Sequence, residues 1–196
     1  MKQEIVKVLK DLKQIELFDN PNYSRIVSIL RQGELNIKEI HKLFNKDYED
    51  KKTLTSIYRY MEKLLENDLV FVSREELKRG HLLERYYSRT ALIFLFEDEM
   101  SEENAINAAS ELLLKLYDLG EEKEEELRKV LREWVKDMDR WGVDFYEKYG
   151  EEILELEKTY GFKAVKVAAG KFSEFLYFRE NPEVIEKLFK ILEAKN

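Results

Sequence analysis

Cysteine is absent from the 196-residue chain, and proline and glycine are scarce, with 2 and 7 occurrences. Without cysteine the chain can form no disulfide, no thiolate metal site and no cysteine-based catalytic nucleophile. Because few glycine or proline residues interrupt the sequence, long helices are expected to dominate. The lack of cysteine, together with few glutamines and abundant lysine and glutamate, is also typical of proteins from thermophiles.

No membrane-spanning segment and no signal peptide is expected from the sequence. No apolar run approaches the roughly 18 residues that a membrane-spanning helix needs. The opening sequence MKQEIVKVLKDLK is amphipathic, unlike a signal peptide. We therefore expect a cytoplasmic protein that makes no contact with a membrane.

The sequence also lacks the common catalytic and cofactor-binding motifs. It has no GxSxG nucleophile motif, no P-loop and no GxGxxG dinucleotide motif. The two histidines, His41 and His81, lie in different predicted elements, without the HxxxH or HExxH spacing of zinc sites. We expect no enzyme activity, no metal and no cofactor.

Charge divides the chain into two halves. The whole chain carries −7, but residues 1–97 hold 18 Lys and Arg against 16 Asp and Glu, a balance of +2. Residues 98–196 hold 16 against 25, a balance of −9. A polyanion such as DNA attracts basic surfaces and repels acidic ones. The sequence therefore predicts two domains, 1–97 and 98–196, of which only the first faces nucleic acid.

Four helices are expected in the first half, from apolar residues at helical spacing. They cover about residues 2–17, 20–32, 36–46 and 53–67. Asn36 followed by Glu39 is a capping-box pattern that opens the third of them. Leu35, alone between two turns, is consistent with a very short strand.

Two β-prone runs come after these helices. They are LVFV at 69–72 and HLLERYY at 81–87, separated by a charged turn at 74–80. The last three of these helices, followed by a two-stranded hairpin, predict a winged helix-turn-helix domain with a two-stranded wing. The expected fold is therefore mainly α, with an α+β N-terminal part and a C-terminal helical dimerisation region.

The second half has a helical pattern throughout. Ser101 is expected to cap a helix to about residue 118, a long helix starts at about 121, and Gly150 and Gly161 are expected to separate further helical segments. Large apolar residues in the long helix step by four and three positions, as on the a/d face of a coiled coil. This seam consists of Leu127, Leu131, Trp134, Met138, Trp141 and Phe145. We expect it to join two subunits, although an antiparallel bundle within one chain would use it equally well.

Three segments of the first half carry a resemblance to a known family. They are NPNYSRIVSILRQGELNIKEIHKLFN, TLTSIYRYMEKLLENDLVFV and the wing phrase KRGHLLERYYSRTA. Over residues 19–91 the chain resembles the ArsR-like winged helix-turn-helix transcription regulators, most closely those of archaea. The resemblance implies a DNA-binding regulator whose C-terminal region pairs two subunits. The turn NKDYEDKK is longer than the family's usual turn, and the cysteines of the metal-sensing members are missing.

The helix at about 53–67 is the expected recognition helix. Its apolar residues Ile57, Met61 and Leu64 turn inward, which leaves the other face for contacts. Hydroxyl and guanidinium groups near a helix N-terminus suit base edges and phosphates, and the N-terminus itself attracts phosphate. The DNA contacts expected here are Lys51, Lys52, Thr53, Thr55, Ser56, Tyr58 and Arg59. A solvated face with a threonine cap is the alternative interpretation.

The wing is expected at 74–82, with a basic tip that can neutralise phosphates or reach a minor groove. The DNA contacts expected here are Lys78, Arg79, Gly80 and Arg85. Neighbouring glutamates dilute this charge, and the alternative interpretation is a solvated, charged strand edge. Arg89 is equally consistent with a carboxylate partner inside the domain. Tyr86 and Tyr87 alternate faces, so at least one is expected in the core.

The combined prediction is a homodimeric, sequence-specific double-stranded DNA-binding transcription regulator. Its recognition helix would enter the major groove and its wing would contact the backbone or minor groove. The alternative is a winged-helix protein-interaction module with the acidic helical bundle as its binding surface. Aromatic residues are frequent between 134 and 178; they fit a core and dimer interface, or the lining of an effector pocket.

Overall fold

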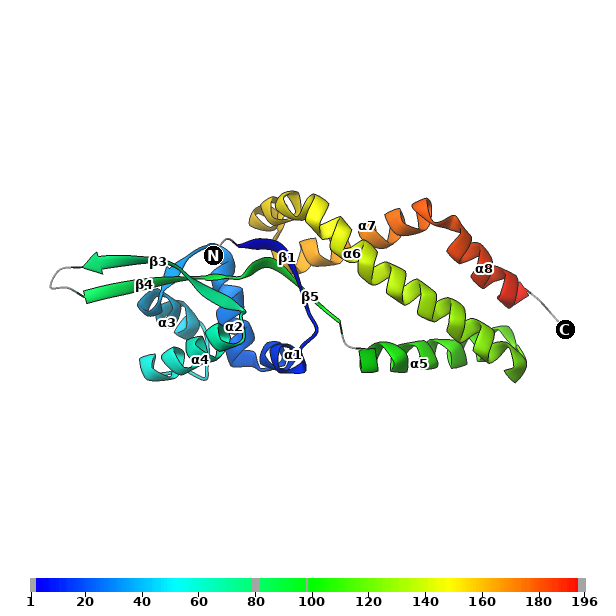
Figure 1. The fold of residues 1–196 in the computed structure, drawn as a ribbon, viewed down its shortest axis with the longest axis horizontal. Coiled ribbons are helices and arrows are strands. Elements are labelled where there is room, and N and C mark those ends of the chain that lie inside the picture. Colours follow the sequence, from blue (N-terminus) through cyan, green and yellow to red (C-terminus); the bar gives the residue numbers. More distant parts are fainter. Residues whose placement is uncertain (1–2, 79–81, 98, 194–196) are drawn as a thin grey trace. The chain divides into compact units, whose positions relative to one another are not determined.

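The computed structural model describes residues 3–78, 82–97 and 99–193 (Figure 1). The chain divides into two compact units, Met1–Phe96 and Glu97–Asn196. The first unit combines helices with two small sheets, and the second is helical in its described part. The fold is that of a winged helix with a helical region after it, as the sequence predicts.

The helical part of the first unit is built from short segments. They are α1 (Leu12–Asp19), α2 (Pro21–Ile29), a 3-10 turn at Leu30–Gln32, α3 (Ile37–Asn45) and α4 (Leu54–Glu66). The predicted capping box at the start of α3 is confirmed: the Asn36 side chain accepts the backbone N–H of Glu39 at 3.0 Å, and the Glu39 carboxylate accepts the N–H of Asn36 at 2.9 Å. The core between α2, α3 and α4 includes Ile26, Ile40, Phe44, Ile57 and Leu64, all 0% exposed.

The wing is an antiparallel pair of strands, β3 (Val70–Lys78) and β4 (Leu82–Arg89). The short strand β2 (Leu35–Asn36), expected at Leu35, pairs with the other edge of β4, so the sheet order is β2-β4-β3. The predicted charged turn at 74–80 is wrong for its first five residues, because β3 continues to Lys78, opposite Leu82. Cross-strand ion pairs between β3 and β4, and the packing of Arg74 on the Tyr86 ring, explain why this polar run is a strand.

The helix predicted over residues 2–17 is also wrong. Its first part is a strand, β1 (Glu4–Leu9), which pairs in parallel with β5 (Ala91–Phe96), and α1 begins only at Leu12. Val6 lies opposite Ile93 and Val8 opposite Leu95. β-Branched side chains favour a pleated strand when an apolar neighbour is available, and β5 is that neighbour.

Thr90 connects these sheets to the end of α4. It is 4% exposed, and its N–H donates to the carbonyl of Leu69 at 3.0 Å while its hydroxyl donates to the carbonyl of Asp68 at 2.8 Å. Its own carbonyl accepts the N–H of Glu4 at 2.9 Å. One residue between β4 and β5 therefore fastens the C-terminal side of α4 and the start of β1.

The second unit consists of α5 (Glu99–Tyr117), a 3-10 turn at Glu121–Lys123, α6 (Glu124–Tyr160), α7 (Phe162–Glu180) and α8 (Pro182–Glu193). α5, α7 and α8 all pack against the long helix α6 (Figure 1). Two sequence expectations are corrected here. Ser101 lies inside α5 rather than capping it, and Gly150 lies buried within α6, which ends at Gly161 with φ 80°.

Candidate nucleic-acid interface

Helix α4 has one buried and one exposed face. Ile57, Met61 and Leu64 are at most 1% exposed, as their spacing predicted. On the other side lie three residues that the sequence proposed as DNA contacts and that are exposed, namely Thr55, Tyr58 and Arg59. Tyr58 is 51% exposed, so its ring and hydroxyl are accessible to a partner. The helix is thus held rigidly while this face remains available.

The N-terminus of α4 is closed by Thr53. Its hydroxyl accepts the backbone N–H of Ser56 at 3.2 Å, which is the capping hydrogen bond, and lies 3.0 Å from the Ser56 hydroxyl. Just before it, the Lys52 ammonium is paired with Asp50 at 2.5 Å, and this hydrogen bond raises the pKa of Lys52. Lys51 and Arg59 are exposed and form no ion pair with the residues that the structure describes.

The long turn between α3 and α4 is fixed by side chains of α3. The Asn45 amide accepts the N–H of Lys52 at 2.8 Å and donates to the Lys52 carbonyl at 2.9 Å. Nε2 of His41 lies 3.0 Å from the same carbonyl. Arg25 donates to the carbonyls of Phe44 and Lys46, both at 2.8 Å, and stacks 4.2 Å from the Tyr48 ring centre. The extra length therefore forms an ordered connection that sets where α4 begins.

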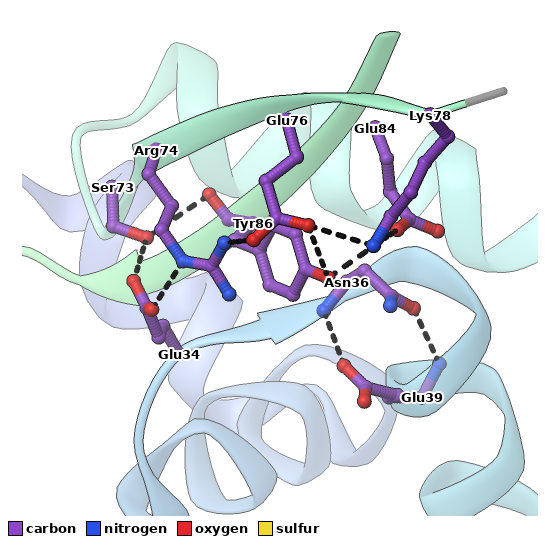
Figure 2. Close-up of polar contacts among 9 residues, drawn as sticks. All are labelled: Glu34, Asn36, Glu39, Ser73, Arg74, Glu76, Lys78, Glu84 and Tyr86. Carbon is purple, nitrogen blue, oxygen red and sulfur yellow. Dashed lines mark hydrogen bonds and ion pairs between the residues drawn. The ribbon is translucent and has the colours of Figure 1, made fainter. Parts of the chain in front are cut away.

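Figure 2 shows that one face of the wing is a closed network of opposite charges. Arg74 pairs with Glu34 at 2.5 Å and with Glu76, and its guanidinium lies 3.5 Å from the Tyr86 ring centre. Lys78 is 2.7 Å from Glu76 and 3.4 Å from Glu84. The hydrogen bond from Arg74, with a second from Ser73, lowers the pKa of Glu34. Lys78, proposed as a DNA contact, is thus already neutralised by carboxylates.

The other wing residues have mixed roles. Arg85, also proposed as a DNA contact, pairs with Glu75 at 2.9 Å across the strands. Arg89 is buried and donates to the carbonyl of Leu92 at 2.7 Å, which settles its role as structural. Tyr86 and Tyr87 are both buried, whereas the sequence predicted that at least one of them would be. Arg79 and Gly80 lie outside the described residues.

Sequence reasoning missed one basic stripe. Lys38, Lys42 and Lys46 occur at four-residue spacing along α3 and its C-cap, and all three are exposed. Among the described residues they form no ion pair. Residues four apart lie on one side of a helix, so this spacing was a signal that could have been used.

The described residues contain no group of three His, Cys, Asp or Glu side chains that could hold a metal ion. His41 instead contacts the Lys52 carbonyl and the Asn45 amide, and His81 is outside the described part. No described helix is both long and apolar enough to cross a membrane.

The seam predicted on the long helix lies against other helices of the same chain. Leu127 packs with Ile191 and Leu192 of α8, and Phe145 packs with residues of α7. The indole N–H of Trp141 donates to both the carbonyl and the hydroxyl of Ser173 at 3.1 Å. The structure thus places these seam residues in contacts within one chain.

No protein-family model and no curated protein sequence matches the chain. Among solved structures, the crystal structure of Bacillus subtilis PadR in complex with operator DNA is similar over 76% of this chain and 97% of that chain. The sequence identity is 17% and the TM-score is 0.32. With a likeness this low, function has to be argued from the residues of this chain.

Proposed function

We propose that the chain is a sequence-specific, double-stranded DNA-binding transcription regulator that acts in the cytoplasm as a homodimer. The recognition helix α4 enters the major groove, and the wing at 74–82 lies on the backbone or in the minor groove. The observation that carries this proposal is the exposed face of α4, where Thr55, Tyr58 and Arg59 project from a helix anchored by a buried apolar face.

The chemistry of this face suits DNA. A guanidinium reads guanine through two acceptors on its major-groove edge, and hydroxyl groups bond to bases or phosphates. Lys51 sits just before the helix N-terminus, where the helix dipole also favours a phosphate. Because the wing cations Lys78 and Arg85 have carboxylate partners, α4 and the α3 stripe carry most of the binding free energy in this proposal.

Arg59→Ala tests the assignment of α4. Duplexes selected from a random library by the wild-type chain are titrated by fluorescence anisotropy at stepwise salt concentrations. We expect roughly tenfold weaker binding, near the lower end of the range for loss of one guanidinium contact to a base. Lys63→Ala is the matched control, because it removes one positive charge from the same helix but from a residue that pairs with Glu66. Equal losses in the two variants would contradict recognition by Arg59.

Glu76→Gln tests whether carboxylates restrain the wing. Glu76 holds both Arg74 and Lys78, so its neutralisation frees positive charge on the wing. We expect binding about threefold tighter at low salt and a salt slope steeper by up to one ion. Glu16→Gln, on the exposed surface of α1, is the control for the change in net charge. An unchanged slope in the Glu76 variant would place the wing away from the duplex.

Protein binding through the winged helix is the second candidate function. The wing cations Lys78 and Arg85 have carboxylate partners, which favours protein binding over DNA binding for the wing itself. Leu77 and Leu83 lie directly opposite each other and are 71% and 48% exposed, which gives this wing an apolar face as well. The salt titration separates the two functions. A chain that binds no duplex even at low salt would contradict DNA binding and leave the protein-interaction module as the remaining candidate.

A dimer is expected because two winged helices related by a two-fold axis read two half-sites about one helical turn apart. We assign its formation to residues 98–196. The seam formed by Leu127, Leu131, Trp134, Met138, Trp141 and Phe145 stays a prediction for this joint. Because seam residues already contact α7 and α8 of the same chain, another surface of the second unit could instead bind the partner subunit.

A further inference from the structure

The second unit leaves an unusual amount of apolar surface in contact with water. Among the described residues it has 11 buried hydrophobic side chains and 10 large hydrophobic side chains that are exposed. The corresponding numbers for the first unit are 16 and 5. Single exposed hydrophobic residues are normal on a protein surface, whereas contiguous apolar patches mark contact sites. The positions of these ten residues therefore decide whether the second unit has such a patch.

Helix α7 has a second apolar face, turned away from α6. Val165, Ala169 and Leu176 form the buried face. Val167, Phe172 and Phe175 lie on the outer side and are 66%, 55% and 61% exposed, with the rings of Phe172 and Phe175 stacked at 6.4 Å. Ala164 and Ala168 continue this face toward the N-terminus of α7. The outer face of α7 is defined by Ala164, Val167, Ala168, Phe172 and Phe175.

Helix α5 carries a comparable stripe. Ala105, Ala109, Leu112 and Leu116 are spaced at steps of four, three and four residues, the spacing of one continuous helical face. Leu112 is 56% exposed and Leu116 is 68% exposed. The residues that α5 buries, including Ile106 and Ser110, lie on a different side. These four residues are the outer stripe of α5.

The two helices that carry these surfaces have opposite net charge. α7 contains four Lys or Arg against two Glu, a balance of +2, although it belongs to a half with a balance of −9. α5 contains four Glu against one Lys, a balance of −3. Two copies of α7 would repel each other weakly, whereas α7 of one copy attracts α5 of another. The net charges of the two helices therefore favour the pairing of α7 with α5 over that of α7 with itself.

The exposed apolar area is more than half of what each partner buries in a typical specific interface. Large side chains that are about half exposed present roughly 100 Å² each. The three on α7 and the two on α5 together give about 500 Å² of apolar surface per copy, against about 800 Å² in total per partner in a typical specific interface. The alanines and the charged rims supply more. A two-fold axis would bury both surfaces of both copies where the two surfaces of one copy face the same partner.

We propose that a second copy of this chain covers these surfaces, with the outer face of α7 packed on the outer stripe of α5 of the partner, and reciprocally. The inference deepens the homodimer in the proposed function and rests on it. In this arrangement the α6 seam keeps its contacts within the chain. The exposed faces of α7 and α5 are covered by the second copy.

Sedimentation equilibrium of the full chain tests the pairing. The 23.6 kDa chain is expected to sediment as a dimer. Phe172→Ser with Phe175→Ser, and separately Leu112→Ser with Leu116→Ser, are each expected to weaken dimerisation at least tenfold. Because these side chains are exposed, circular dichroism should show an unchanged helix content. Leu156→Ser with Tyr160→Ser is the matched control, since it removes two exposed apolar side chains of α6 outside both surfaces and should leave the dimer intact.

The outcomes separate the alternatives. Weakening by both the α7 and the α5 pair supports the proposal. Weakening by the α7 pair alone would mean that α7 associates with itself, and weakening by neither would leave the seam as the joint; both results overturn it. Binding to a single half-site duplex is measured in parallel. A monomeric variant that still binds the half-site would leave the DNA-binding function standing, so failure of the dimer surface and failure of the function can be told apart.

Discussion

Replacing Phe44 by alanine is expected to destabilise the first unit by about 3–5 kcal/mol, the usual range for loss of a buried phenylalanine ring. Phe44 is 0% exposed, its ring meets the Tyr48 ring edge-on at 5.3 Å, and Arg25 lies over it at 5.4 Å. The cavity left by alanine would lie in the core between α2, α3 and α4. The surrounding side chains belong to three helices, which limits how far the site can collapse.

The measurement has to separate the two units. Both tryptophans, Trp134 and Trp141, belong to the second unit, so their fluorescence reports that unit alone. Hydrogen exchange of amides in α3 and α4 should show the loss of protection in the first unit. Lys42→Ala, on the exposed side of α3, is the control and should change stability by less than about 0.5 kcal/mol. A loss below about 1 kcal/mol for Phe44→Ala would contradict the packing around this ring.

Asn45→Ala is expected to reduce DNA affinity at least tenfold, with no loss of a direct DNA contact. Its amide makes two hydrogen bonds to the backbone of Lys52, each worth about 1 kcal/mol, and these fix the connection that leads into α4. Without them the N-terminus of α4 loses its fixed position relative to α3. The titration used for Arg59→Ala measures the effect, and thermal unfolding measures the accompanying loss of stability.

A control in the same connection makes this result interpretable. Glu49 is exposed, and Glu49→Gln leaves both Asn45 hydrogen bonds in place. We expect it to keep or slightly increase DNA affinity because it removes a negative charge. If Asn45→Ala binds as tightly as the wild-type chain, then either the connection does not position α4 or α4 does not contact the duplex.

Local patterns in the sequence predicted the elements whose contacts are close in the chain. The Asn36–Glu39 capping box and the buried face of α4 can be inferred from residues at most a few turns apart. The β1–β5 pair was missed because its partners are separated by more than 80 residues. Ile5, Val6 and Leu9 also fit a helical face, and only the presence of β5 decides between helix and strand.

The candidate interface shows the same limit. Helical spacing was enough to predict that Thr55, Tyr58 and Arg59 are exposed. It did not predict the partners of the wing cations, because Glu34 reaches Arg74 across 40 residues and only the folded sheet brings them together. A basic residue in a sequence therefore indicates charge, and its availability to DNA depends on carboxylates that the fold supplies.

Thr90 also has a mechanical consequence. The chain leaves the wing through Thr90, runs along β5 and enters α5 three residues after β5 ends. Because β5 lies parallel to β1, tension along β5 loads their hydrogen bonds in shear, all at once, and does not unzip them one by one. Thr90 passes such a load to the C-terminal side of α4 through Asp68 and Leu69. A load along β5 would thus reach the C-terminal end of α4 through these two hydrogen bonds, and single-molecule stretching should show high resistance at this strand pair.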